Sequence, residues 1–240
     1  MRDMSQEIVE EFWTHELGAG AGFVSVSRQV GWAAQERYNG VQLFRRGERL
    51  IVAAPSHCAK LISGALDGRS VDQSFSRTWL QTTLGDAVER IDGPADILYA
   101  DQSSFRGTVS QDVRALTDAD RGAYHALASA LDGQEIADSG LSADNFPAFG
   151  VFSGDRLCAV ASYRVRQLSI AEILVATHPN YRRQGFAHAA LSALALEAFK
   201  FHLVLELRAP ASNENSLAFA RALGFGHYCS TLFAQLRAPR

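Results

Sequence analysis

Three strand-like segments follow one another in the second half of the chain, and a long apolar helix comes directly after them. Hydrophobic periodicity predicts strands at 149–152, 157–165 and 170–177 and a helix from about 185 to 201. Other helices fall between strands before and after this block. Such an order predicts an α/β (α+β) fold with a mixed, mostly antiparallel sheet and helices on its faces.

The first hundred residues mix short strands and helices in another order. Strands are expected at 41–44, 50–53 and 96–100, and helices at 5–17, 58–66 and around 74–84. The polar, glycine-containing segment 102–108 favours a linker. We therefore expect a smaller mixed α/β domain of unknown role over 1–106 and a second domain over 107–240.

Composition limits the classes of protein to which the chain can belong. The net charge is −3, which argues against a nucleic-acid-coating protein. Cys58, Cys158 and Cys229 lie far apart, so neither a disulfide framework nor a zinc cluster is indicated. We see no secretory signal and no apolar run near the ~18 residues of a membrane span. These features predict a reduced, cytoplasmic protein with no nucleic acid and no membrane as partner.

The segment from Ala171 to Ala187 carries the clearest chemical signal. It reads as a strand, a basic turn and a helix that starts at Gly185. Free backbone N–H groups at a helix N-terminus attract anions, and Arg182 and Arg183 would add charge. This predicts a phosphate-binding turn of neither the P-loop nor the dinucleotide type. The glycine-rich run 18–22 has the wrong spacing for a phosphate loop, and we interpret it as a flexible turn.

Two motifs carry a resemblance to a known family. Arg182-Arg183-Gln184-Gly185-Phe186-Ala187 matches the pattern Arg/Gln-x-x-Gly-x-Gly/Ala. Downstream, an Asn-rich helix start at 213–217 closes with Leu-Gly-Phe at 223–225. Val113 to Asp120 also matches a typical first strand and helix. Over roughly 108–236 the chain therefore resembles the GNAT superfamily of acyl-CoA-dependent N-acetyltransferases.

The resemblance implies acetyl-CoA as co-substrate and no metal. Backbone amides from about 183 to 188 would hold the pyrophosphate, and the strand edge 175–177 would pair with the pantetheine arm. Asn213 would hydrogen-bond this arm and Phe219 would pack near it. The implied cofactor-binding residues are Val175, Ala176, Thr177, Arg182, Arg183, Gln184, Gly185, Phe186, Ala187, His188, Asn213 and Phe219.

Catalytic residues are less clearly marked. The resemblance implies Glu172 as the base that deprotonates the amine; the alternative is a strand residue that faces solvent or pairs with Arg164 or Arg166. A backbone N–H near Val175 or Ala176 is the natural oxyanion donor. The family's usual acid, a tyrosine, is replaced by Ala220. Tyr228 is a candidate substitute, and the alternative is a half-buried strand tyrosine.

The resemblance thus implies direct transfer of an acetyl group to an amine in a ternary complex. We expect the acceptor to be the primary amine of a small molecule, with a protein amine as the less favoured acceptor. The alternative is a non-catalytic acyl-CoA-binding or sensing protein with a degenerate centre. The first region lacks the motif and is expected to be structural, or else a decayed second copy of the same fold. A homodimer formed through C-terminal strands stays open.

Overall fold

Contacts along the chain define two compact units. The computed structural model describes residues 4–18, 30–36, 38–108, 113–140 and 147–238, so most of the glycine-rich run at 18–22 lies outside the described residues. The first unit comprises 1–97, 209–213 and 227–240, and the second comprises 98–208 and 214–226. The expected domain boundary after residue 106 stays a prediction, because compactness does not test independent folding.

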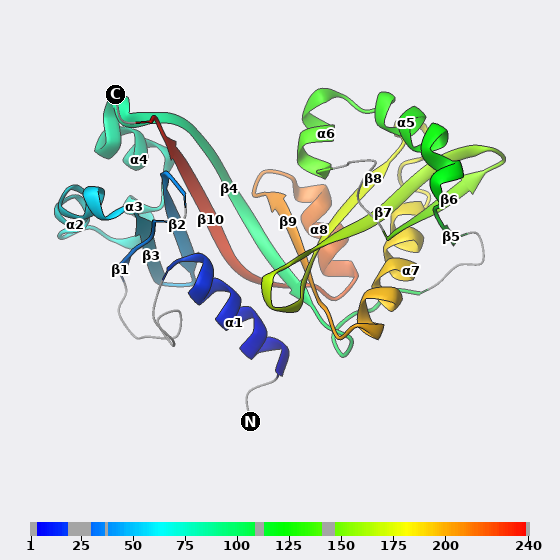
Figure 1. The fold of residues 1–240 in the computed structure, drawn as a ribbon, viewed down its shortest axis with the longest axis horizontal. Helices are drawn as coiled ribbons and strands as arrows, with labels where there is room; N and C mark the ends of the chain where they lie inside the picture. Colours follow the sequence, from blue (N-terminus) through cyan, green and yellow to red (C-terminus); the bar gives the residue numbers. More distant parts are fainter. Residues whose placement is uncertain (1–3, 19–29, 37, 109–112, 141–146, 239–240) are drawn as a thin grey trace. The chain divides into compact units, whose positions relative to one another are not determined.

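The first unit is a five-stranded sheet with helices packed on it. Its strand order is β1-β3-β2-β10-β4, in which β1 and β3 are parallel and β2 is antiparallel to both β3 and β10. The elements are α1 (Met4–Glu16), β1 (Val30–Ala34), β2 (Gly40–Arg46), β3 (Arg49–Ala54), α2 (Ala59–Leu66), α3 (Val71–Ser74), α4 (Arg77–Leu84), β4 (Val88–Ala100, through Ile97) and β10 (Gly226–Leu236, from His227) (Figure 1).

Both faces of this sheet are buried. Alternate residues of β2 and β3 pack with Ile62 of α2 and with Leu80 of α4 in one hydrophobic cluster. Phe44, which points the other way, contacts Trp13 of α1 at 4.9 Å between ring centres. Burial on two faces explains why β3 reads as an uninterrupted apolar run rather than an alternating one.

The second unit is also a five-stranded sheet, and it carries the segment with the chemical signal. Its order is β9-β8-β7-β6-β5, antiparallel except for the parallel pair β8 and β9. The elements are β5 (Val113–Ala115), α5 (Arg121–Ser129), α6 (Gly133–Ser139), β6 (Ala148–Ser153), β7 (Arg156–Arg166), β8 (Ile170–Thr177), α7 (Phe186–Lys200), β9 (Val204–Pro210, through Arg208) and α8 (Glu214–Ala222). The predicted fold class is confirmed.

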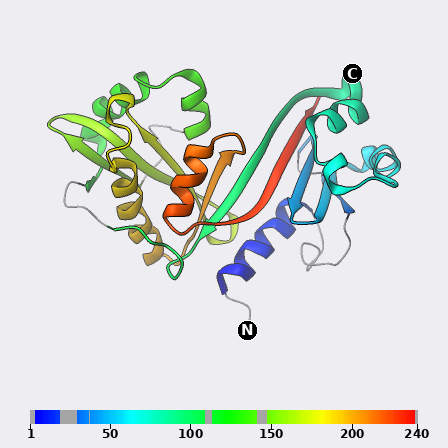
Figure 2. The same cartoon turned by 180° about the vertical axis from the view of Figure 1, so that it is seen from behind.

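Helices cover both faces of the second sheet, with α5 and α6 on one side and α7 on the other (Figures 1 and 2). Tyr124 and Leu127 of α5 pack with Leu157, Val160 and Ala176 of the sheet. Along β8 the side chains of Glu172 and Leu174 share this face with Ala176, since strand side chains alternate. β8 therefore lies between two layers of helices.

Gly133 begins α6, because Asp132 caps that helix by accepting a hydrogen bond from the Glu135 N–H at 2.7 Å. Three local features of the structure differ from the expectations. The expected strand 96–100 is only the end of the longer β4, and β1 was not expected at all. The linker-like segment 102–108 packs through Phe105, whose ring lies 5.7 Å from Phe199. The polar composition of the segment gave no sign that Phe105 packs in this way.

Asp120, just before α5, accepts hydrogen bonds whose contribution to stability can be tested. Arg114 donates to both of its carboxylate oxygens, at 2.6 and 2.8 Å, and Thr117 donates through its backbone N–H at 2.8 Å. The hydrogen bond from Arg114 lowers the pKa of Asp120 far below its usual 3.8. A lowered folded-state pKa means that the stabilisation is present above the unfolded-state pKa and is lost as pH falls. We expect Asp120→Asn to lower the melting temperature at pH 7, and the difference from wild type to shrink below about pH 4.

The matched control is Asp118→Asn. Asp118 is 85% exposed and pairs with Arg121 on the same helical turn, so its removal should change the melting temperature little at any pH. Thermal unfolding of both variants from pH 7 to pH 2.5 makes the comparison. Equal effects of the two substitutions would contradict the role assigned to Asp120.

Candidate functional site

The central feature of the second unit is a strand edge that loses its partner halfway along. β7 pairs with β8 over all eight residues of β8, from Ile170 to Thr177. On the other side β9 pairs with only the first three, and the last matched rung joins Glu172 to Glu206. We call the β9-facing side of Ile173–Thr177 the open edge. An extended ligand can add to such an edge as an extra strand.

Strand geometry decides which backbone groups face the open edge. The His178 N–H donates to the Cys158 carbonyl at 2.8 Å, so residue 178 points toward β7. In an antiparallel pair the direction of the backbone N–H and C=O groups alternates along the chain. The backbone groups of Ala176 therefore also face β7, whereas those of Val175 and Thr177 face the open edge. Of the two expected oxyanion donors, only the Val175 N–H faces the opening. The Ala176 side chain instead packs under α5.

The turn after β8 ends at Gly185, whose backbone conformation favours glycine. Gly185 is the N-cap of α7 with φ +82°, a left-handed conformation that side chains disfavour. A Cβ placed there would meet no atom within 4 Å, so the space before the helix is open. The first N–H groups of a helix have no partner inside it, and those of residues 186–188 begin α7 beside this space. The turn therefore fits an anion, as its sequence predicts.

The other predicted residues of the turn have different environments. Arg183 and Gln184 are exposed, and Arg183 takes a left-handed φ of 59°. Arg182 forms an ion pair with Glu135 of α6, so it ties the turn to that helix. Phe186, Ala187 and His188 form the half-buried first turn of α7.

Glu172 occupies the last rung before the opening and is almost fully buried. Arg164, directly opposite on β7, donates hydrogen bonds to both of its carboxylate oxygens, at 2.6 and 2.9 Å. Burial alone would raise the pKa of Glu172, but the hydrogen bonds and charge of Arg164, with Arg166 and Arg208 nearby, bring it below 4.5. The structure thus has the ion pair that we gave as the alternative. The role of Glu172 as base stays a prediction.

Glu206, across the same rung on β9, was missed from the sequence. Its side chain is wholly buried, and burial raises its pKa above 4.5. The Tyr99 hydroxyl of β4 donates to Oε2, and Arg166 lies 3.4 Å from Oε1. The signal that could have found it is an acid within the apolar run 203–207. A carboxyl is rarely buried inside a strand without a specific partner.

The predicted residues near α8 fall in both units. Phe219 is half-buried on α8, and Ala220 beside it is fully buried, with its carbonyl accepting from Leu223 and Phe225. Asn213 precedes α8, donates its N–H to the Pro210 carbonyl at 2.8 Å, and is grouped with the first unit. Their predicted contacts with the cofactor stay predictions.

Tyr228 lies in the first unit, on β10. The Arg46 guanidinium stacks 4.2 Å from its ring centre and also donates to its hydroxyl at 3.3 Å. Phe44 packs edge-on against the ring at 6.2 Å. Burial raises the pKa of Tyr228, so the phenol stays protonated at neutral pH. This is the half-buried strand tyrosine of the alternative interpretation, and its role as an acid stays a prediction.

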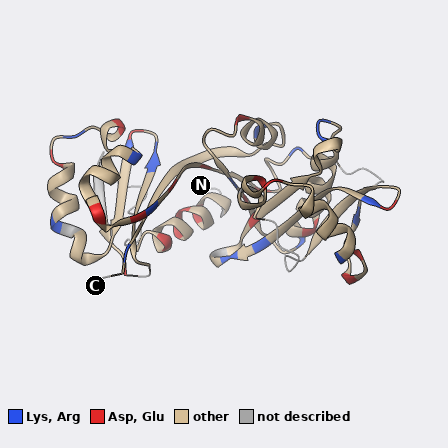
Figure 3. Ribbon diagram, turned by 90° about the horizontal axis from the view of Figure 1, so that it is seen from above, with Lys and Arg blue, Asp and Glu red and all other residues tan. Residues whose placement is uncertain are grey.

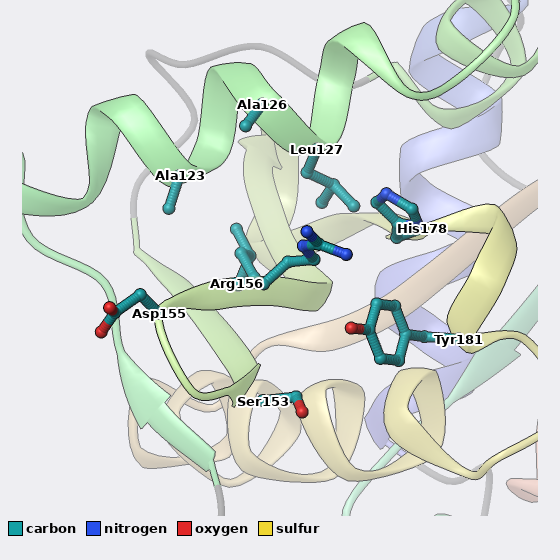
Figure 4. A pocket seen from close by; sticks show the side chains of 9 residues that line it. Ala123, Ala126, Leu127, Ser153, Asp155, Arg156, His178 and Tyr181 are labelled. Carbon is teal, nitrogen blue, oxygen red and sulfur yellow. The ribbon is translucent and has the colours of Figure 1, made fainter.

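A cavity of about 560 Å³ lies on the other side of β8 from the open edge. Arg156, His178 and Tyr181 turn toward one another within it (Figure 4). It is lined by Ala123, Ala126, Leu127, Ser153, Asp155, Arg156, Leu157, His178 and Tyr181. The cavity shares His178 and Tyr181 with the segment 171–187, but none of the predicted cofactor-binding or catalytic residues lines it.

A metal centre and a membrane-spanning helix are two other features that a chain of this kind could carry. No group of three or more His, Cys, Asp or Glu residues that could hold a metal was found among them. Within the same part of the chain, no helix has the length and apolar character needed to cross a membrane. Acidic and basic segments are interspersed along the ribbon of each unit (Figure 3).

Comparisons with known proteins point to one family. A family model described as GNAT acetyltransferase matches residues 143–230, a stretch that includes the open edge, the turn and α7. A GNAT-family structure from Novosphingobium aromaticivorans is 25% identical, with a TM-score of 0.51 over 63% of this chain and 67% of that one. No curated protein matches the sequence significantly.

Two further solved structures are similar to this chain. A Drosophila protein, 13% identical, has a TM-score of 0.50 over 78% of this chain and 69% of its own. A GNAT-family acetyltransferase from Colwellia psychrerythraea, 15% identical, has a TM-score of 0.49 over 66% of this chain. This chain spans 61% of the Colwellia protein.

The pair formed by Arg164 and Glu172 gives an asymmetric prediction for stability. Arg164→Met leaves a buried carboxylate without its main partner and should lower the free energy of unfolding by about 1–3 kcal/mol. Glu172→Gln leaves a guanidinium that is 61% exposed and can be hydrated. This substitution should therefore lower the free energy of unfolding by at most about 1 kcal/mol. Urea unfolding at pH 7 measures both effects.

The variant with both substitutions completes a double-mutant cycle. Because the penalty of Arg164→Met comes from the unpaired carboxylate, Arg164→Met/Glu172→Gln should be more stable than Arg164→Met alone. Glu172 has a lowered pKa, so the penalty should fade as pH drops below the ordinary glutamate range. Additive single effects, independent of pH, would contradict this account.

Proposed function

We propose that this chain, a member of the GNAT superfamily, is an acyltransferase that moves an acetyl group from acetyl-CoA to the primary amine of a small molecule. The single observation that carries the proposal is the open edge of β8, which leads into the left-handed Gly185 at the start of α7. A backbone edge and an anion-binding helix start thus follow each other on one continuous segment. This arrangement suits a long ligand with an extended arm and a charged diphosphate.

The residues present fit acetyl-CoA. The open space at Gly185 and the N–H groups of 183–188 would receive the pyrophosphate. Exposed Arg183 would add charge. Backbone groups of Val175 and Thr177 would pair with the pantetheine amides. When bound, acetyl-CoA supplies the activated acetyl thioester.

The chain's own groups would assist the transfer to an amine. The Val175 N–H faces the opening and would donate to the thioester oxygen as negative charge develops there. A base must also take a proton from the acceptor, because an ammonium group has no free electron pair. We propose direct transfer, since a strand edge that aligns the thioester would leave its carbonyl carbon open to an amine in the same site.

The proposed acceptor is a small amine rather than a nucleic-acid-bound one. The net charge is −3, and acidic and basic residues are mixed along the chain. A nucleic-acid-associated substrate would favour a basic surface. We likewise keep a cytoplasmic location and a homodimer as proposals.

One observation favours a second function, a non-catalytic acyl-CoA sensor. Ala220 is fully buried and offers no hydroxyl where the family often has its acid. A sensor would bind acetyl-CoA and release no thiol with any amine. Thiol release measured with a panel of small amines, and with peptides bearing free amines, separates the two functions, since transfer to any physiological amine removes the sensor.

Binding of acetyl-CoA should depend on Gly185. We expect wild type to bind acetyl-CoA with micromolar affinity and Gly185→Glu to lose it, because the substitution puts bulk and negative charge where the pyrophosphate would lie. Isothermal titration calorimetry with acetyl-CoA measures both. Absence of binding by wild type would overturn the proposed function.

Gly154→Glu is the matched control. Gly154, in the turn between β6 and β7, also has a positive φ, 58°, and a Cβ there would also meet open space. The substitution therefore introduces the same strain and charge at a turn that the proposal does not use. It should bind acetyl-CoA like wild type, and loss of binding there as well would assign the Gly185→Glu effect to strain or net charge.

A further inference from the structure

We propose that Tyr99 and Glu206 form the proton-transfer pair of this acetyl transfer, with Tyr99 meeting the acceptor amine and Glu206 holding the proton behind it. The inference rests on the proposed function and concerns residues that neither motif includes. It assigns the base and the acid to the same two side chains.

The position of Glu206 is the first support. It lies opposite Glu172 on the last paired rung of β8 and β9, so it stands where the opening begins. Residues that pair in register point to the same face of a sheet, here the face covered by α5 and α6. Glu206 is therefore at the junction between the open edge and the sheet interior, beside the place proposed for the thioester.

The connection to Tyr99 is the second support. Tyr99 lies on β4, the neighbour of β9 on the side away from β8, and its hydroxyl donates to Glu206 Oε2. Glu206 is wholly buried and cannot touch a substrate itself, whereas Tyr99 is half-buried. We therefore assign the contact with the acceptor to the partly exposed Tyr99, whose hydroxyl would pass a proton to and from the buried carboxyl.

The two carboxyls of the rung differ in the way that base catalysis requires. Arg164 holds Glu172 at two oxygens, which lowers its pKa and weakens it as a base. Glu206 accepts from Tyr99, lies 3.4 Å from Arg166 and has the charges of Arg208 and Glu172 nearby, but burial outweighs the groups that favour its anion and raises its pKa. A general base works best with a pKa near the operating pH, and Glu206 is shifted in that direction.

The proton steps balance over one turnover. The acceptor arrives as an ammonium ion and gives one proton to the Tyr99 oxygen while Tyr99 passes its own proton to Glu206. The freed nitrogen lone pair forms the C–N bond to the acetyl carbon, and the C–S bond breaks. The nitrogen's second proton leaves to water, and Glu206 returns its proton through Tyr99 to the departing sulfur. Ammonium and thioester become amide, thiol and one released proton.

This pair also accounts for the missing acid of α8. Ala220 cannot donate a proton, and Tyr228 belongs to a cluster with Phe44 and Arg46 in the first unit. Tyr99 supplies a phenol hydroxyl from another strand, with a buried carboxyl to restore its proton. A centre without the usual tyrosine is then still able to protonate the thiolate.

The test compares Tyr99→Phe, Glu206→Gln and Glu172→Gln by their pH profiles of kcat/KM. Wild-type kcat/KM should rise with pH as Glu206 ionises. Tyr99→Phe and Glu206→Gln should each lower kcat by about 10²–10⁴-fold and abolish this rise, while the KM for acetyl-CoA changes little. Glu172→Gln should retain the rise. Full activity in Glu206→Gln, or loss of the rise in Glu172→Gln alone, would overturn the proposal.

A second measurement does not depend on turnover. Infrared titration of wild type should reveal a protonated carboxyl band that persists above the ordinary glutamate range and is missing from Glu206→Gln. Tyr99→Phe removes a hydrogen bond to the ionised form, so the band should persist to still higher pH. A Glu206 that is ionised throughout would refute the pair. Acetyl-CoA binding by wild type tests the proposed function separately.

The variants are expected to fold. Glutamine keeps the size of Glu206 and is neutral, which burial favours, so Glu206→Gln should be at least as stable as wild type at pH 8. Phenylalanine keeps the packing of the Tyr99 ring. Thermal unfolding and acetyl-CoA titration check both before any rate is compared.

Discussion

Pairing between β8 and β9 ends after three rungs, and the features of the proposed site follow from this. A strand whose backbone groups lose their partner must be hydrated, covered or bound by something else. In this chain the unpaired stretch continues directly into the turn and the helix start of α7. Backbone acceptors and donors for an extended arm are therefore followed, without any insertion, by donors for an anion. Neither half depends on the chemistry of a particular side chain, apart from the glycine that permits the turn.

Charged side chains gather at the point where the pairing ends. Two glutamates face each other across the last rung, and arginines at 164, 166 and 208 surround them. Two like charges so close cannot both be equally easy to ionise. Arg164 settles the difference by binding Glu172 at both oxygens, which leaves Glu206 as the carboxyl that burial disfavours as an anion. The asymmetry arises from the register of three strands rather than from any motif.

Local patterns were enough to predict most of what lies close in sequence. The strand, turn and helix from 170 to 200 were expected within a residue or so, because periodicity and a glycine define them without help from the rest of the chain. Interactions between distant residues were not accessible in this way. Tyr99 and Glu206 are 107 residues apart, and Phe105 packs against Phe199 and Phe225 from a segment whose composition favours a linker. The grouping of β10 with β2 depends equally on a long-range register.

The same reasoning explains why the sequence suggested Tyr228, and not Tyr99, as a candidate acid. A family pattern predicts a tyrosine on the last helix, and where the pattern has Ala220 the nearest tyrosine along the chain is Tyr228. Distance along the chain is a poor guide inside a sheet, because neighbouring strands come from distant segments. β4 enters the second unit only with its last residues, 98–100, and the hydroxyl of the middle one reaches the buried carboxyl of β9. A phenol held in this way needs no helix to position it, since the strand fixes its direction and the carboxyl fixes its hydrogen bond.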